Sequence, residues 1–384
     1  MHSKLAKAIE VITSCVGSNG VWASNDRYKN QCWTRDFCLA THKAMMTQTF
    51  CEVQPRPEAG GSNNNPPQKF EKAVAKKIIT EQLMEIARRQ RSNGQLPILY
   101  LDDEIQFVKD KINRLGEDKP VSFMLRRYAQ NEIENLTPHT RDAELLFIVT
   151  VYNLLANDFG LDECRKQILM YACKKALEYI ESNTTDGLMV GGDWRDTRYD
   201  LDDKTVLSNA CLLYQVYKLM NNTKKMNKVY QTIQTKFFNG EYFVDYPGSN
   251  HFDIMGNSFA VIYGIADSTQ SNSIFEHVQK NLATPFGFKM SETFLPALSA
   301  TEESVMKNDK AVIWPFINGY LLLAMAKSGS AKWKNIAHVE FEKWLNVDGF
   351  YEWYDITNGN GYGSKDQVWS AALLLMVHDS LIDG

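Results

Sequence analysis

Amphipathic helical patterns recur along the whole sequence, without the strand–helix alternation that is typical of a parallel sheet. In residues 70–91, Ala75, Ile79, Leu83 and Ile86 fall on one helical face, and Asn93-Gly94 is a stop signal behind them. After a first amphipathic helix near the N-terminus, further helices are predicted over 141–157, 162–182, 204–221, 223–237, 255–266, 272–282, 315–328, 331–345 and 365–381. Strands are predicted only as short pieces at 242–244 and 349–351. We therefore expect an all-α fold of many antiparallel helical hairpins.

The domain organisation follows from the same patterns. A length of 384 residues alone favours two domains. No change of composition marks a boundary, however, so we expect one domain over 1–384. The Pro-, Gly- and Asn-rich run at 55–67 predicts a mobile loop near 51–69.

Charge and composition exclude several classes of function. The net charge is −4 with no basic block, which argues against a nucleic-acid partner. No stretch approaches the roughly 20 apolar residues of a membrane span, and Glu10 interrupts what would be the core of a signal peptide. The 7 cysteines form no CxxC pair, which favours buried free thiols in a reducing compartment. We expect a cytoplasmic protein that needs no membrane.

The connections between the predicted helices hold the chemically distinctive residues. They are rich in Trp, Tyr, Asp, Asn or Gly, and they lie at 21–36, 94–103, 136–142, 191–197, 246–257, 311–319 and 350–369. Loops of this kind usually build a site on a rigid scaffold. If alternate loops of a ring of hairpins open on one face, they line a cleft with rings and acids.

Such a cleft suits a sugar, because aromatic rings cover its CH faces and polar side chains bind its hydroxyls. The candidate rings are Trp22, Trp33, Trp194, Trp314, Trp353 and Trp369, and the polar groups beside them are Arg35, Asp36, His139, Arg141, Asp142, Asn257 and Asn318. Any single tryptophan has about even odds of being a core residue instead. His251 and Asp253 have no third ligand nearby to complete a metal site, so we expect neither a metal nor another cofactor.

Cleavage of a glycosidic bond needs two carboxyl groups, and two segments are the best sources. The stretch GGDWRDT at 191–197 offers Asp193 and Asp196, which compete for one role. The stretch FYEWYD at 350–355 offers Glu352 between two aromatic rings. The alternative for an aspartate before an apolar helix is a helix N-cap. Asp200, Asp202 and Asp203 fit that alternative well, because the helix predicted from residue 204 follows them.

Taken in order, these motifs resemble the six-hairpin glycoside hydrolases. The matching segments are WTRDF (33–37), GQLPILYLD (94–102), TPHTRD (137–142), GGDWRDT (191–197), FDIMGN (252–257), WPFINGY (314–320) and YEWYD with GYGSKDQVWSAAL (351–373). These enzymes are (α/α)6 toroids that include amylo-α-1,6-glucosidases, neutral invertases and processing α-glucosidases. The resemblance covers nearly the whole chain. We expect no extra N-terminal β-sandwich of the kind that many members carry, and segment 101–135 looks specific to this subgroup and suited to cover the cleft.

The resemblance implies an inverting hydrolase of an α-glycosidic bond in a small oligosaccharide or glucoside. It places the general acid at Asp196, two residues after Trp194, and the general base at Glu352. Arg35 and Asp36 would grip sugar hydroxyls. The full set of expected substrate contacts is Trp33, Arg35, Asp36, Asp103, His139, Arg141, Asp142, Asp193, Trp194, Asn257, Trp314, Asn318, Trp353, Lys365 and Trp369.

Two alternatives stay open at this point. A non-catalytic carbohydrate-binding protein on the same toroid would keep the rings without needing an acid pair. A toroid lyase or epimerase would use His139 with Arg141 at a uronate-like substrate. The sequence leaves the sugar, the linkage and the oligomeric state undetermined.

Overall fold

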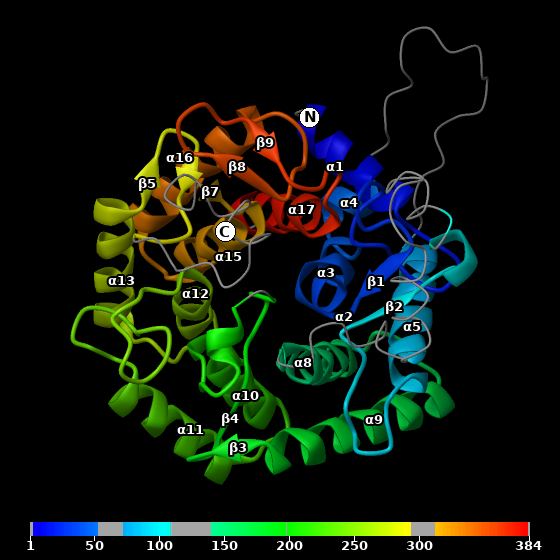
Figure 1. Cartoon of the computed structure of the whole chain (residues 1–384). Coiled ribbons are helices and arrows are strands. Elements are labelled where there is room, and N and C mark those ends of the chain that lie inside the picture. Colours follow the sequence, from blue (N-terminus) through cyan, green and yellow to red (C-terminus); the bar gives the residue numbers. More distant parts are fainter. Residues whose placement is uncertain are drawn as a thin grey trace, which may run out of the picture.

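The computed structural model describes residues 3–52, 72–107, 109, 140–196, 198–292 and 312–382. Within these residues, outer and inner helices alternate along the chain and form two concentric rings (Figure 1). The outer helices are α1 (Ser3–Ser14), α5 (Lys72–Arg88), α9 (Glu163–Ser182), α11 (Thr223–Lys236), α13 (Ser268–Asn281) and α16 (Ala331–Asn346). The inner ring holds α8 (Asp142–Ala156), α10 (Leu207–Leu219), α12 (Ile254–Ile262), α15 (Pro315–Lys327) and α17 (Val368–Ile382). One further inner segment joins α2 (Thr34–Asp36), the π-helical turn η1 (Phe37–Thr41) and α3 (His42–Ala44).

The inner ring is closed, because each member contacts the next. These contacts run from η1 to α8, α10, α12, α15 and α17, and α17 returns to η1. The architecture is therefore an all-α toroid, as the sequence predicted. Apolar periodicity explains which helices lie inside. Every residue of α15 from Pro315 to Met325 is buried, whereas α11 buries only Val229 and Ile233, so α11 can cover the rim.

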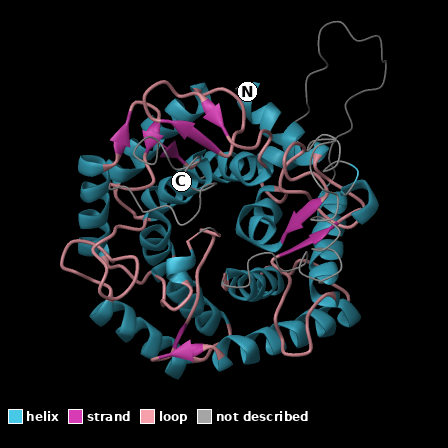
Figure 2. Ribbon diagram, in the orientation of Figure 1, coloured by secondary structure: helices cyan, strands magenta, loops and turns pink. Residues whose placement is uncertain are grey.

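Strands are short and antiparallel, and they lie in the connections (Figure 2). The strands are β1 (Gln31–Trp33) with β2 (Leu99–Leu101), β3 (Thr184–Thr185) with β4 (Leu188–Met189), β5 (Ala283–Thr284) with β6 (Gly287–Phe288), and the sheet of β7 (Val312–Ile313), β8 (Trp353–Asp355) and β9 (Gly361–Tyr362). In that sheet Ile313 pairs with Tyr354, and Trp353 pairs with Tyr362. A short helix, α4 (Gln48–Glu52), and a 3-10 turn, η3 (Tyr199–Leu201), complete the described elements.

Polar side chains in the first turns of inner helices fix these connections. The amide of Asn257 bonds both the N–H and the C=O of Phe243, and the amide of Asn318 does the same at Phe288. Asn209 donates to the carbonyls of Gly191 and Gly192, and Glu144 accepts from the N–H of Leu96. These four inner helices thereby hold backbone of earlier connections, which satisfies buried polar groups that helix and strand pairing leave open.

Most predicted helices are confirmed to within a few residues, but three local expectations were wrong. The strand expected at 349–351 begins instead at Trp353. The helix expected from 204 begins at Leu207, and its N-cap is Val206 without a side-chain bond. The aspartates expected to cap it do not do so: Asp200 pairs with Arg198, and the exposed Asp203 with Lys204.

Other expectations have mixed outcomes. The piece at 242–244 makes isolated bridges, Phe238 with Phe243 and Val244 with Phe252, in place of a full strand. None of the seven cysteines forms a disulfide, and Cys15, Cys32, Cys38, Cys173 and Cys211 are buried. No helix among the described residues is long and apolar enough to cross a membrane. Most of the loop near 51–69 and of the segment 101–135 lies outside the described residues.

Candidate active site

Arg35 stands at the centre of three carboxyl groups that come from separate connections. Its Nη1 and Nη2 donate to the two carboxylate oxygens of Asp196 at 2.8 and 3.0 Å. Oδ2 of Asp142 lies 3.8 Å from Nη1, and Oδ1 of Asp36 lies 3.7 Å from Nε. Arg35 and Asp36 end α2, Asp142 begins α8, and Asp196 lies between β4 and α10. The fold thus joins predicted site residues from 21–36, 136–142 and 191–197.

The π-helical turn η1 directly follows Arg35 and Asp36 and sets the position of these two residues. Thr41 donates its hydroxyl to the carbonyl of Asp36 at 3.1 Å, and Nδ1 of His42 lies 2.9 Å from the carbonyl of Phe37. Both contacts reach back five residues along the chain. Turns of this kind are rare and are found often at functional sites.

Burial dominates the electrostatics of the cluster. It raises the pKa of Asp36 and of Asp142 to about 7, because the dry surroundings disfavour the charged forms more than Arg35 favours them, and Asp196 adds to both shifts. For Arg35, burial acts against the charge, but the three carboxylates outweigh it and raise the pKa of the guanidinium. Arg35 is therefore always charged, while Asp36 and Asp142 exchange protons near neutral pH.

Three polar atoms of the cluster are buried and have no hydrogen-bond partner among the described residues. They are Nε of Arg35, Oδ1 of Asp36 and Oδ1 of Asp142. One is a hydrogen-bond donor, and the two carboxyl oxygens accept a hydrogen bond from a ligand when ionised. Buried polar groups are normally paired, so unpaired ones beside a charged cluster indicate a site for a ligand.

Glu352 reaches the same region from the far end of the chain, just before β8. Tyr28 donates its hydroxyl to Oε1 at 2.9 Å, and the N–H of Ser364 donates to Oε2 at 3.0 Å. Burial, reinforced by Glu352, raises the pKa of Tyr28 well above its usual value, so the hydroxyl stays a donor. Asp196 also acts on Tyr28, and Glu352 acts on Asp36. The two carboxyl groups expected to be catalytic therefore share one electrostatic environment.

Aromatic rings form a wall beside the arginine. The guanidinium carbon of Arg35 lies 5.2 Å from the ring of Trp33 and 5.9 Å from the ring of Trp369, within reach of cation–π attraction. Trp369 stacks on Phe316 with ring centroids 3.9 Å apart. Trp314 and Trp194 pack edge-on against Phe316, so both predicted rings belong to this wall.

Asp193 lies in a second, fully buried cluster and not at Arg35. Arg195 donates to Asp193 through Nε at 2.8 Å and through Nη2 at 2.9 Å, and Ser208 donates to the same carboxylate. Burial opposes its charge, but Arg195 outweighs it and lowers the pKa of Asp193. Of the two aspartates that competed in the sequence, only Asp196 bonds Arg35.

Several other predicted contacts are engaged in local structure. Asn257 and Asn318 hold backbone, as described above. Arg141 donates to the carbonyl of Thr140, and the exposed Asp103 accepts from the N–H of Gln106. The structure does not bring these four side chains to the Arg35 cluster, and composition alone could not distinguish them from ligand-binding groups. His139 lies outside the described residues.

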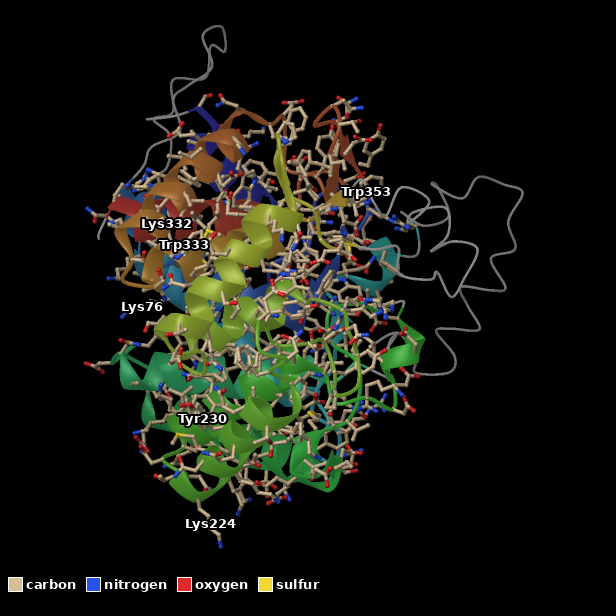
Figure 3. All side chains as sticks on the ribbon, turned by 90° about the vertical axis from the view of Figure 1, so that its left-hand side faces the viewer. Lys76, Lys224, Tyr230, Lys332, Trp333 and Trp353 are labelled. Carbon is tan, nitrogen blue, oxygen red and sulfur yellow. The ribbon has the colours of Figure 1, made fainter. Side chains whose placement is uncertain are left out.

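Trp353 and Lys365 lie close to Glu352 in sequence but have different neighbours. Trp353 stacks on Tyr362 with centroids 4.8 Å apart, and the exposed Lys365 lies over the ring of Tyr351 at 5.6 Å. Figure 3 shows Trp353 on the opposite side of the molecule from Lys76, Lys332 and Trp333. Lys332 and Trp333 are in the first turn of the outer helix α16, so Trp353 lies on the face where connections lead into inner helices.

Tyr28 was missed by the sequence reasoning, although it lies in the connection 21–36 that was singled out. Phe316 was missed as well, two residues after Trp314. An aromatic residue carries no sequence signal for a hydrogen bond to a glutamate 324 positions away, so Tyr28 could be found only through the fold.

Comparison with known proteins supports the fold. No family model matches the sequence, and a search of curated proteins gives no match. Solved structures do match over nearly the full chain. A glycosidase variant in complex with glucose is 13% identical with a TM-score of 0.65, over 99% of this chain and 96% of that one. A GH63 mannosylglycerate hydrolase from Thermus thermophilus in complex with glucose is 11% identical with a TM-score of 0.64, over 96% of this chain and 98% of that one. The chain has the glycoside-hydrolase toroid fold that its motifs resemble.

Proposed function

We propose that the chain is an inverting glycoside hydrolase that cleaves an α-glycosidic bond in a small oligosaccharide or glucoside. The observation that supports the proposal is that Tyr28, which donates to Glu352, also lies within electrostatic reach of Asp196, the partner of Arg35. Loops from the middle and the last part of the sequence supply the two carboxyl groups that glycosidic cleavage needs. The glycosidase names of the solved structures with this fold, two of which hold glucose, support the same class of substrate.

Asp196 serves as the general acid and Glu352 as the general base. Glu352 is oriented by Tyr28 and by the N–H of Ser364, and it takes a proton from the attacking water. The water oxygen bonds to the anomeric carbon as the glycosidic C–O bond breaks. Asp196 gives its proton to the leaving oxygen. One water is consumed, and the anomeric configuration is inverted.

The sugar is held by the groups that surround this pair. Asp36 and Asp142 accept hydrogen bonds from hydroxyls through their unpartnered oxygens. Trp33, Trp314 and Trp369 cover apolar sugar faces, and Trp353 contacts a more distant part of the substrate. No metal or other cofactor enters the scheme. Seven cysteines without a disulfide support a reducing, cytoplasmic location.

The test is a substrate screen followed by stereochemistry. We expect release of free sugar from at least one of sucrose, trehalose, maltose, isomaltose, maltooligosaccharides and mannosylglycerate. Proton NMR of the first product should show the β-anomer. An α-anomer would contradict inversion. Sugar binding in a calorimeter without hydrolysis would identify a binding protein instead, and an ultraviolet-absorbing unsaturated product would identify a lyase.

A further inference from the structure

Asp196 covers a buried arginine. The side chain of Arg35 is 3% exposed, whereas that of Asp196 is 24% exposed, and the two-point contact occupies both terminal nitrogens of the guanidinium. A hydroxyl that arrives from solvent meets Asp196 before it can reach Arg35. In this arrangement each residue restricts the other: the two N–H groups of Arg35 that hold Asp196 cannot bind a hydroxyl, and Asp196 cannot turn toward a leaving oxygen.

The surroundings allow this ion pair to separate without leaving Arg35 as an uncompensated buried charge. When Asp196 leaves, Asp142 and Asp36 remain 3.8 and 3.7 Å from the guanidinium and still compensate Arg35. Losing such a partner entirely would cost far more, because an unpaired charge would be left buried. Arg35 is also held between the rings of Trp33 and Trp369, so it keeps its place when its partner changes.

We propose that the Arg35–Asp196 ion pair is a latch that keeps the general acid inactive until a sugar hydroxyl displaces Asp196 from Arg35. The latch rests on the proposed hydrolase function. The incoming hydroxyl accepts from Arg35 and donates to Asp36. The freed Asp196 takes up one proton from the buffered bulk solvent and turns to the glycosidic oxygen. Proton donation is thereby confined to molecules that hold a sugar.

The general-acid role makes this proton uptake necessary. A carboxyl group that protonates a leaving oxygen has to carry the proton before the C–O bond breaks. Asp196 accepts from both terminal nitrogens of Arg35 as a carboxylate, so it has to leave Arg35 and gain a proton first.

Calorimetric titration with D-glucose tests the latch, using the wild-type protein and the variants Asp196→Asn and Asp203→Asn. Asparagine keeps the shape of Asp196 but removes the ion pair that glucose has to displace, whereas Asp203 is exposed and pairs with Lys204, so its replacement is the control. We expect Asp196→Asn to bind glucose about tenfold more tightly than wild type, and Asp203→Asn to stay within about threefold of wild type. Equal or weaker binding by Asp196→Asn would overturn the latch.

A second measurement on the wild-type protein does not depend on any variant folding. Repeating the titration at pH 7 in buffers of different ionisation enthalpy gives the number of protons bound with the sugar. We expect net uptake approaching one proton, and no uptake would also overturn the latch. If glucose binds and substrates are hydrolysed without either signature, the latch fails and the proposed function stands. If no sugar is bound or cleaved by wild type, both fail.

Discussion

Two arginines in this chain are each surrounded by carboxyl groups, and the two clusters differ in how fully their hydrogen bonds are made. Arg195 donates four bonds of 2.7 to 2.9 Å to Asp193 and Asp245, and the three side chains are 2 to 7% exposed. Arg35 makes a two-point contact with Asp196 alone, which is the most exposed member of its cluster. Three buried atoms of this cluster, one of them Nε of Arg35, have no hydrogen-bond partner among the described residues.

We take this difference to separate a structural cluster from the proposed functional one. A buried cluster in which an arginine holds both of its carboxylates at two points fixes one geometry. The cluster around Arg35 instead keeps two carboxyl oxygens without a hydrogen-bond partner among the described residues. Asp193 and Asp196 lie three residues apart in one loop, so this short loop supplies one carboxyl group to each cluster.

Replacing the two proposed catalytic carboxyls gives the largest expected effect. We expect Asp196→Asn and Glu352→Gln each to lower kcat by about a thousandfold or more on a confirmed substrate, because proton transfer is lost at one step. The melting temperature should stay within a few degrees of wild type. Asp193→Asn is the matched control, which should lose stability while its folded fraction keeps turnover within about tenfold. Near-wild-type turnover by Asp196→Asn would contradict the assignment of Asp196 as the general acid.

The two arginines should differ in stability when each is replaced. Arg195→Met leaves buried carboxylates uncompensated, and we expect it to lower the free energy of unfolding by about 3–5 kcal/mol. Arg35→Met should lower it by only about 1–2 kcal/mol, because Asp196 can turn to solvent and Asp36 and Asp142 can hold protons. Urea unfolding at pH 7 measures both. Equal losses would remove the distinction between the clusters.

The smallest effect is a pH trend at Asp142. Burial raises its pKa to about 7 in the folded protein, above the roughly 3.9 of an unfolded chain, so the folded form keeps a proton that the unfolded form has lost. The stability that the folded form gains from this proton therefore decreases as the pH rises through about 7. Relative to wild type, Asp142→Asn should gain about 2 kcal/mol of unfolding free energy between pH 5 and pH 8.

Asp193→Asn is the control for that trend. Arg195 lowers the pKa of Asp193, so this carboxylate is ionised throughout the range, and its replacement should cost a nearly constant amount from pH 5 to pH 8. Urea midpoints measured at several pH values give both curves. A flat difference for Asp142→Asn would contradict the buried, proton-exchanging role of Asp142.

The helices could be predicted because their apolar spacing is a local property. Leu83 and Ile86 on α5 mark a buried stripe whatever the rest of the chain does. The fold class followed from the sum of such stripes. Helix starts were harder, because backbone bonds to other connections decide them. The N–H of Leu207 bonds the carbonyl of Asp245, which fixes the start of α10 where the aspartates at 200–203 suggested an earlier one.

The residues of the site could be predicted from the composition of the connections, but their hydrogen-bond partners could not. Arg35, Asp36, Asp142 and Asp196 were all singled out, yet nothing in the sequence showed that Arg35 bonds Asp196 while Arg195 bonds Asp193. Asn257 and Asn318 have the same composition signal and hold backbone instead. Hydrogen-bond partners depend on contacts between distant segments, which a single sequence does not contain.

The contact between Tyr28 and Glu352 lies at the seam where the first and last hairpins close the ring. Ser24 and Ser364 bond there at 2.8 Å, and Ser24 bridges Gln367. Segments more than 300 residues apart must find each other before this seam forms, and such distant pairings are the slow part of folding. Helix content can therefore recover early after dilution from denaturant, whereas the orientation of Glu352 waits for closure. The time course with which any catalytic activity recovers would therefore report the rate of the last step of ring assembly.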